Sequence, residues 1–268
     1  MVDASGALVR TENITLPRSV MMHDFAITRE HVLFFDLPVV FDLEVQPFPF
    51  RWDEEHTPRV GVMPRNGGDA DVQWFEVDRC YVFHPMNAFT EGDTVVVDVP
   101  RHATMFESRG ALIEGPNRGG PPALHRWSFD LASGRASDET VDERGQEFPR
   151  VNETLLGSRH RYGYAVAVET TDALDATGCV KHDFTAGTSE VHDFGPGRSP
   201  GEFVFVPSES GTSEDDGWLM GFVHDAATDR SALVILDAHD FGAGPVATVH
   251  LPTRVPFGFH GNWVADPR

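Results

Sequence analysis

Three histidines in this 268-residue chain have bulky apolar neighbours. His23 lies within residues 21–28, His84 within residues 81–87 and His260 within residues 255–263. An imidazole among Phe, Met and Trp side chains is costly to charge, and it is useful as a neutral nitrogen donor to a metal ion. We therefore interpret these three histidines as converging on one metal centre.

Spacing alone does not support this interpretation, because the three histidines lie much farther apart than the ligand pairs of zinc fingers or His-Glu-x-x-His helices. The chain has 13 histidines, and neutral histidines are common in ordinary structural roles. The remaining ones lie in polar or turn-like surroundings, where surface or hydrogen-bonded roles explain them: His31, His56, His102, His125, His160, His182, His192, His224, His239 and His250.

The elements that must position these histidines read as strands separated by turns. Residues 60–64 and 72–77 flank an Asn-Gly-Gly turn, and residues 80–83 are expected to pair with residues 94–99, so that His84 ends a strand. Prolines at 47 and 49 favour a loop over residues 47–52. No apolar stripe of helical length occurs, which predicts an all-β fold of repeated antiparallel sheets. Further strands are expected at 124–131, 162–168, 180–184, 190–194, 203–207, 218–224, 232–237 and 246–251.

Composition excludes several classes of function. A hydrophobic content of 40% allows a sizeable core, and a formal net charge of −21 argues against nucleic acid as a partner. Cys80 and Cys179 are too far apart for a disulfide framework or a thiolate zinc site to be indicated. No apolar run is long enough to span a membrane and no leader is recognisable, so we expect a cytoplasmic protein. The sequence also contains no calcium-binding loop motif, no Gly-x-Ser-x-Gly nucleophile elbow of hydrolases and no nucleotide-binding motif.

Five sequence motifs, in this order along the chain, resemble those of the carotenoid cleavage oxygenase family. That family includes stilbene-cleaving dioxygenases and the visual-cycle retinoid isomerase. The motifs are HDFAIT, FHPMNAF with the following VVVDV, EFPRVN, GEFVFVP and VPFGFHGNW. The resemblance runs from Met21 to Trp263. It implies a seven-bladed β-propeller in which four histidines hold one non-haem Fe(II), with three glutamates behind three of those histidines.

Carried over by motif, His23 resembles the second iron ligand of that family, His84 the third and His260 the fourth. Glu147 resembles the glutamate behind the third ligand, and Glu202 the one behind the fourth. A carboxylate behind a metal-bound histidine fixes its tautomer and raises its basicity. The resemblance implies no catalytic residue beyond this metal site.

The sequence departs from the family pattern at its start. The family's first histidine and the glutamate behind the second ligand precede HDFAIT, whereas only residues 1–22 do so here, with no histidine among them. We therefore expect residues 1–268 to form a single, partial β-propeller domain without the N-terminal blades. Open sheet edges in an incomplete ring favour self-association and poor solubility.

The activity implied by the resemblance is that of an Fe(2+)-dependent dioxygenase. It would use O2 to cleave a conjugated C=C bond of a carotenoid, apocarotenoid or stilbene into two carbonyl products, with the apolar substrate reached by peripheral membrane contact or from solution. Residues 100–122 are expected to cover the propeller face near the substrate entrance. Two alternatives stay open: a catalytically inactive truncated propeller that acts as a binding module or remnant, and a propeller hydrolase with a hydrated divalent ion.

Overall fold

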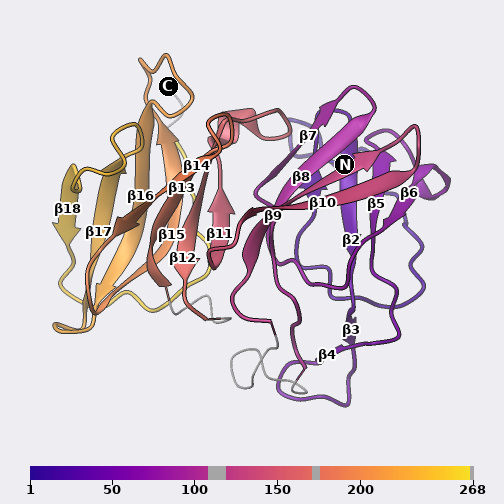
Figure 1. Cartoon of the computed structure of the whole chain (residues 1–268), viewed down its shortest axis with the longest axis horizontal. Coiled ribbons are helices and arrows are strands. Elements are labelled where there is room, and N and C mark those ends of the chain that lie inside the picture. Colours follow the sequence, from indigo (N-terminus) through magenta and orange to yellow (C-terminus); the bar gives the residue numbers. More distant parts are fainter. Residues whose placement is uncertain (108–118, 171–175, 266–268) are drawn as a thin grey trace.

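The computed structural model describes residues 1–107, 119–170 and 176–265, and these form antiparallel sheets (Figure 1). Within them there is no α-helix, only the 3-10 turns η1 (Asp69–Asp71) and η2 (Glu153–Leu155), and no helix long and apolar enough to cross a membrane. The all-β prediction is confirmed. Sheet 1 contains β1 (Ala26–Ile27), β2 (His31–Asp36), β5 (Arg59–Pro64) and β6 (Gln73–Glu76). Sheet 2 contains β7 (Asn87–Glu91), β8 (Thr94–Arg101), β9 (Ala123–Asp130) and β10 (Arg135–Asp142).

Two further four-stranded sheets follow in the chain. Sheet 3 contains β11 (Gln146–Arg150), β12 (Tyr162–Val168), β13 (Ala176–Asp183) and β14 (Thr188–Asp193). Sheet 4 contains β15 (Arg198–Pro207), β16 (Gly217–Asp225), β17 (Arg230–Asp237) and β18 (Ala247–His250). A small extra sheet pairs β3 (Val39–Phe41) with β4 (Phe50–Trp52). The loop predicted over residues 47–52 therefore ends in a short strand, which the two prolines before it allow.

Each four-stranded sheet is built in chain order from one edge to the other, as in a propeller blade. Neighbouring sheets adjoin near their first strands, because β1 contacts β7, and β11 contacts both β8 and β15. Sequence-distant segments that precede or form these first strands are thereby brought to one place. Among the described residues we count four such sheets, so a seven-bladed ring remains a prediction.

The partner of β8 differs from the prediction. β8 pairs with β7, from Asn87↔Asp98 to Glu91↔Thr94, whereas Tyr81 forms only an isolated bridge to His102. The turn between β7 and β8 places Gly92 at a φ of 60°, a conformation that glycine adopts without steric cost. His84 therefore precedes a strand instead of ending one, and residues 80–83 run across to the far end of β8.

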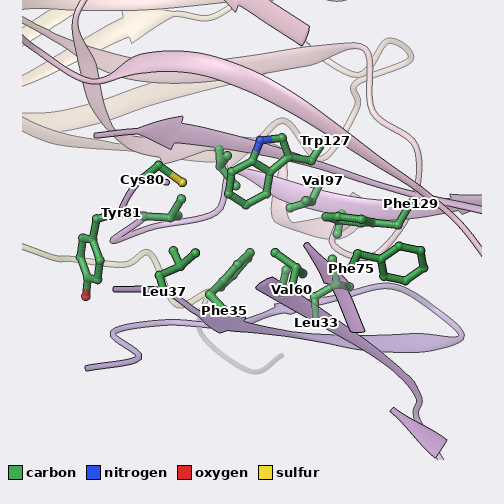
Figure 2. Close-up of a cluster of buried hydrophobic side chains, with 14 of the residues drawn as sticks. Leu33, Phe35, Leu37, Val60, Phe75, Cys80, Tyr81, Val97, Trp127 and Phe129 are labelled. Carbon is green, nitrogen blue, oxygen red and sulfur yellow. The ribbon is translucent and has the colours of Figure 1, made fainter. Parts of the chain in front are cut away.

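The largest core lies between sheets 1 and 2 (Figure 2). Leu33 and Phe35 of β2 face Trp127 and Phe129 of β9, and all four are almost completely buried. A second core joins sheets 3 and 4, with Tyr164 stacked on Phe205. Buried aromatic side chains of this size dominate packing energetics, so the two sheet pairs are rigid supports. Both free cysteines lie within these cores, which agrees with the absence of a disulfide framework.

Residues 108–118, in the segment expected to cover the propeller face, lie outside the described residues.

Candidate metal centre

The structure brings the three predicted histidines together. His23 lies just before β1, His84 just before β7, and His260 on the irregular segment that follows β18. Each offers one ring nitrogen, and these three nitrogens all lie within 4.8 Å of one another. The ring centroid of His84 lies 5.1 Å from that of His23 and 4.7 Å from that of His260. One ion could therefore contact all three rings.

Glu147 lies behind His84, on the first strand of sheet 3. Its Oε2 accepts a hydrogen bond from His84 Nδ1 at 2.7 Å, and its side chain is only 1% exposed. The pairing of β11 with β12 shifts register between Glu147 and Arg150, and Phe148 has a φ of 51°. A non-glycine residue in that conformation is strained, and such residues concentrate at functional sites. The bulge also lets the Phe148 backbone N–H donate to Glu147 Oε2 at 2.6 Å.

Glu202 lies behind His260 in a similar position, on the first strand of sheet 4. It accepts from His260 Nδ1 at 3.2 Å and from the Gly261 backbone N–H at 2.9 Å. Arg150 donates to both oxygens of Glu202 at 2.9 Å, and to the Gly261 carbonyl at 2.7 Å. β15 also shifts register against β16, between Pro200 and Phe203. Both glutamates thus sit at β-bulges, which often aim side chains at functional sites.

One residue at the centre was not predicted as part of it. His102 is almost fully buried, and its Nε2 lies 3.0 Å from Glu147 Oε1, so one carboxylate joins two histidines. Its sequence context, Pro-Arg-His-Ala, carries no signal of this role. Only the bridge between Tyr81 and His102 places it beside the chain segment that leads to His84.

His23 lacks a comparable support. Among the residues that the structure describes, no carboxylate hydrogen-bonds its ring; Phe83 packs edge-on against it, with ring centroids 5.3 Å apart. Burial lowers the pKa of His23, and the nearby His84 and His260 lower it further. The ring is therefore held neutral, as a nitrogen donor must be.

His84 and Glu147 shift each other's pKa. Burial disfavours the charged form of His84, but Glu147 outweighs this effect and raises the pKa of the imidazole. Burial would likewise raise the pKa of Glu147, yet the charge of His84 and the hydrogen bonds from His102 and His84 hold it far below its ordinary value of 4.5. Glu147 is therefore a carboxylate at neutral pH.

The donor set fits a divalent transition metal. His84 and His260 direct Nδ1 at glutamates, which leaves Nε2 of each for an ion. His84 Nε2 is buried and makes no hydrogen bond within the described structure, as expected of an atom that serves as a ligand. Imidazole donors without thiolate suit Fe, Cu, Ni or Zn.

The three histidines open onto a pocket of about 480 Å³. Its wall also includes Phe25 before β1, Met86 before β7 and Leu156 after η2, with Arg150 on the polar side. This volume lies in the range of about 300–1,000 Å³ that is typical of small-molecule sites.

Comparisons with known proteins identify the family of the chain. The model of the retinal pigment epithelial membrane protein family matches residues 1–265. A carotenoid cleavage oxygenase of Mycobacterium tuberculosis is 37% identical over 98% of this chain and 62% of its own length. A carotenoid 9,10(9',10')-cleavage dioxygenase of Crocus sativus is 35% identical over 99% of this chain and 52% of its own length.

Solved structures extend the comparison to the fold. The crystal structure of cobalt-substituted ACO from Synechocystis superposes with a TM-score of 0.86 at 28% identity, covering 98% of this chain and 57% of that one. The chain thus spans little more than half the length of the proteins that it matches. The extent of the family match and the identity to these relatives establish that the chain belongs to the retinal pigment epithelial membrane protein family, which includes carotenoid cleavage oxygenases.

Proposed function

We propose that this chain carries most of the metal site of a non-haem Fe(II) dioxygenase that cleaves a conjugated C=C bond of a carotenoid, apocarotenoid or stilbene. The observation that carries the proposal is the approach of three imidazole nitrogens to within 4.8 Å, two of them from rings held at Nδ1 by nearly buried glutamates. Histidines paired with carboxylates in this way are typical of metal ligands.

In this proposal His23, His84 and His260 hold the iron, and Glu147 and Glu202 fix the orientation of the last two rings. A bound ferrous ion with imidazole ligands would supply the coordination positions at which O2 is activated beside the substrate. The chain's own part is to aim the three nitrogens at one point and to hold the His84 and His260 rings by their Nδ1 atoms. The aromatic rings of Phe83 and Phe148, packed against these histidines, exclude water from that side.

The substrate class is proposed from the pocket wall and from the relatives. Phe25, Ile27, Met86 and Leu156 offer apolar surface next to the histidines. The relatives' names refer to carotenoid cleavage, to an apocarotenoid oxygenase of Synechocystis and to an isoeugenol monooxygenase of Pseudomonas putida. Such compounds share a C=C bond within a conjugated, largely apolar framework, and we propose that the pocket receives such a framework.

For the whole protein we propose a seven-bladed propeller to which this chain contributes four blades. Four of seven blades would be about 57% of a propeller, which equals the 57% of the Synechocystis structure that the chain covers. In the absence of further blades, open sheet edges in the incomplete ring would favour self-association. Analytical ultracentrifugation of this chain tests the point, because a monodisperse monomer that melts cooperatively would contradict it.

The experiment that tests the metal site is anaerobic reconstitution with Fe(II), followed by measurement of iron bound per chain. We expect near-stoichiometric iron in the unsubstituted chain and loss of most of it in His84→Ala. His125→Ala is a matched control, because His125 is 13% exposed and donates Nδ1 to Asp138 at 2.7 Å, while His84 is 14% exposed and pairs with Glu147 at 2.7 Å. The control should keep its iron.

Negligible iron in all three chains would contradict the proposal for this chain. It would favour the alternative, a catalytically inactive propeller that acts as a binding module. Iron retained in His84→Ala would instead show that the ion binds elsewhere. Where iron binds as expected, cleavage of a carotenoid and of a stilbene should then be compared, with detection of the carbonyl products.

A further inference from the structure

His102 makes two connections that converge on His84. Through its backbone it pairs with Tyr81: Tyr81 N–H donates to the His102 carbonyl at 2.8 Å, and His102 N–H donates to the Tyr81 carbonyl at 2.9 Å. Through its ring it hydrogen-bonds Glu147 Oε1 at 3.0 Å. The residue therefore ties the start of the segment that carries His84 to the carboxylate that His84 needs.

The two oxygens of Glu147 are divided between two histidines. Oε2 accepts from His84 Nδ1 and from the Phe148 backbone N–H, and Oε1 accepts from His102 Nε2. An ionised carboxylate only accepts hydrogen bonds, so each ring must present an N–H to it. His84 then carries its hydrogen on Nδ1 and His102 carries its own on Nε2. Three donors around one buried carboxylate leave it a single favourable orientation.

The surroundings of the His102 ring suit a role in positioning Glu147. Its Nδ1 is buried and has no hydrogen-bond partner, and Phe83 packs edge-on against the ring with centroids 5.2 Å apart. Leaving a buried polar atom unpaired has a free-energy cost, so such an atom calls for an explanation. The hydrogen bond from His102 Nε2 to the buried Glu147 carboxylate supplies that explanation, because it fixes which ring nitrogen is left without a partner.

We propose that His102 is a positioning residue of the metal centre: its Nε2–H fixes the rotamer of Glu147 and thereby holds His84 in the tautomer that leaves Nε2 for the metal. This inference rests on the proposed metal site. His102 itself contacts neither the pocket nor the metal in this scheme, and it acts only through Glu147.

A simple structural role is the alternative, and the chain offers a matched control for it. His182 is also almost fully buried, and its Nε2 lies 2.7 Å from Oε1 of Gln146, the neighbour of Glu147 on the same strand. Loss of either histidine removes one buried side-chain hydrogen bond to β11. Only the loss of His102 removes a donor from Glu147.

The experiment compares His102→Leu, His102→Gln and His182→Leu with the unsubstituted chain. Leucine fills a similar volume without a donor, whereas glutamine retains an N–H. Two readouts are needed besides the melting temperature: the ¹⁵N shifts of the His84 ring in metal-free protein at alkaline pH, which report its tautomer, and Co(II) affinity from visible absorption.

We expect His102→Leu to convert His84 from the Nδ1–H tautomer to a mixture and to weaken Co(II) binding about 10-fold, the lower end of the loss typical when support of a ligand is removed. His102→Gln should restore both properties. His182→Leu should change neither, even where its melting temperature falls. If His102→Leu does not fold, His102→Asn, whose amide is too short to reach Glu147, is compared with His102→Gln in its place.

The inference is overturned if the donor-free variant leaves the His84 tautomer unchanged, or if His182→Leu changes it equally. Failure of the metal site is a separate result: the unsubstituted chain would bind no Co(II), while the ring shifts would still report whether His102 orients His84.

Discussion

The two glutamate–histidine pairs of the centre are built alike but are held differently. Glu147 and Glu202 both lie at bulges on the first strand of a sheet, and both side chains are nearly buried. The His84 side chain is 14% exposed, whereas that of His260 is 44% exposed. His84 leads directly into a strand, while His260 lies on an irregular segment.

The difference lies in what else touches each carboxylate. Glu147 receives a second buried histidine, His102, and so joins sheets 2 and 3. Glu202 receives the guanidinium of Arg150, which also binds the Gly261 carbonyl. One ligand is therefore positioned by packed sheets, and the other by an ion pair that holds down a segment without regular structure. A paired guanidinium also withdraws charge from the carboxylate, so we expect His260 to be the weaker nitrogen donor.

The largest effect is expected from Glu147→Gln. The amide group of the new glutamine turns an N–H toward at least one of the three N–H groups that donate to Glu147, those of His84, His102 and the Phe148 backbone. A buried donor is then left unpaired, so metal affinity should fall about 100-fold. The free energy of unfolding should fall by about 2–3 kcal/mol, as for a lost hydrogen bond to a buried charged group. Co(II) titration and urea unfolding of the metal-free chain measure the two quantities. An affinity within twofold of the parent would show that the sheet, and not the carboxylate, positions His84.

A smaller effect is expected from Glu202→Gln. Its amide oxygen can still accept from Gly261 and Arg150, so we expect about a 10-fold loss of metal affinity and little change in stability. Glu153→Gln is the control, because Glu153 pairs with Arg150 but touches no histidine. A loss as large as that in Glu147→Gln would remove the distinction between the two pairs.

Arg150→Met tests whether the ion pair holds the segment of His260. Without the guanidinium the Gly261 carbonyl loses its partner, and local opening of residues 255–263 should become easier by about 1.4 kcal/mol, or tenfold in amide exchange. Hydrogen exchange read by mass spectrometry measures this. Arg161→Met, which removes a guanidinium paired with Asp183 elsewhere, should leave the exchange of this segment unchanged.

The last effect concerns acid. Because the pKa of Glu147 is held below its ordinary value of 4.5, its contribution to stability is complete above pH 4.5 and is lost as pH falls toward its folded value. The free energy of unfolding of the parent should therefore fall more steeply with acid below pH 4.5 than that of Glu147→Gln, by at most about 1.4 kcal/mol per pH unit. If the free energies of unfolding of the two chains, measured by urea titration, change in parallel over this pH range, the pKa of Glu147 is not shifted by folding.

Much of the fold and part of the candidate site followed from local sequence. Alternation and turn residues predicted the all-β class, and the strand at residues 162–168 matches β12. Sequence motifs that resemble those of the family identified the residues that the structure brings together, namely His23, His84, His260, Glu147 and Glu202. One local expectation was wrong, since residues 80–83 do not pair with β8.

By itself, the sequence predicted which residues could form the metal site, through motifs that resemble a family, and which segments are strands, through period-two alternation, because both can be read locally. Tertiary structure alone decided which further partners reach the two glutamates. His102 reaches Glu147 across 45 residues, and Arg150 reaches Glu202 across 52, through packing of separate sheets. No local signal marks such contacts, because they depend on register shifts at two bulges and on how neighbouring sheets adjoin.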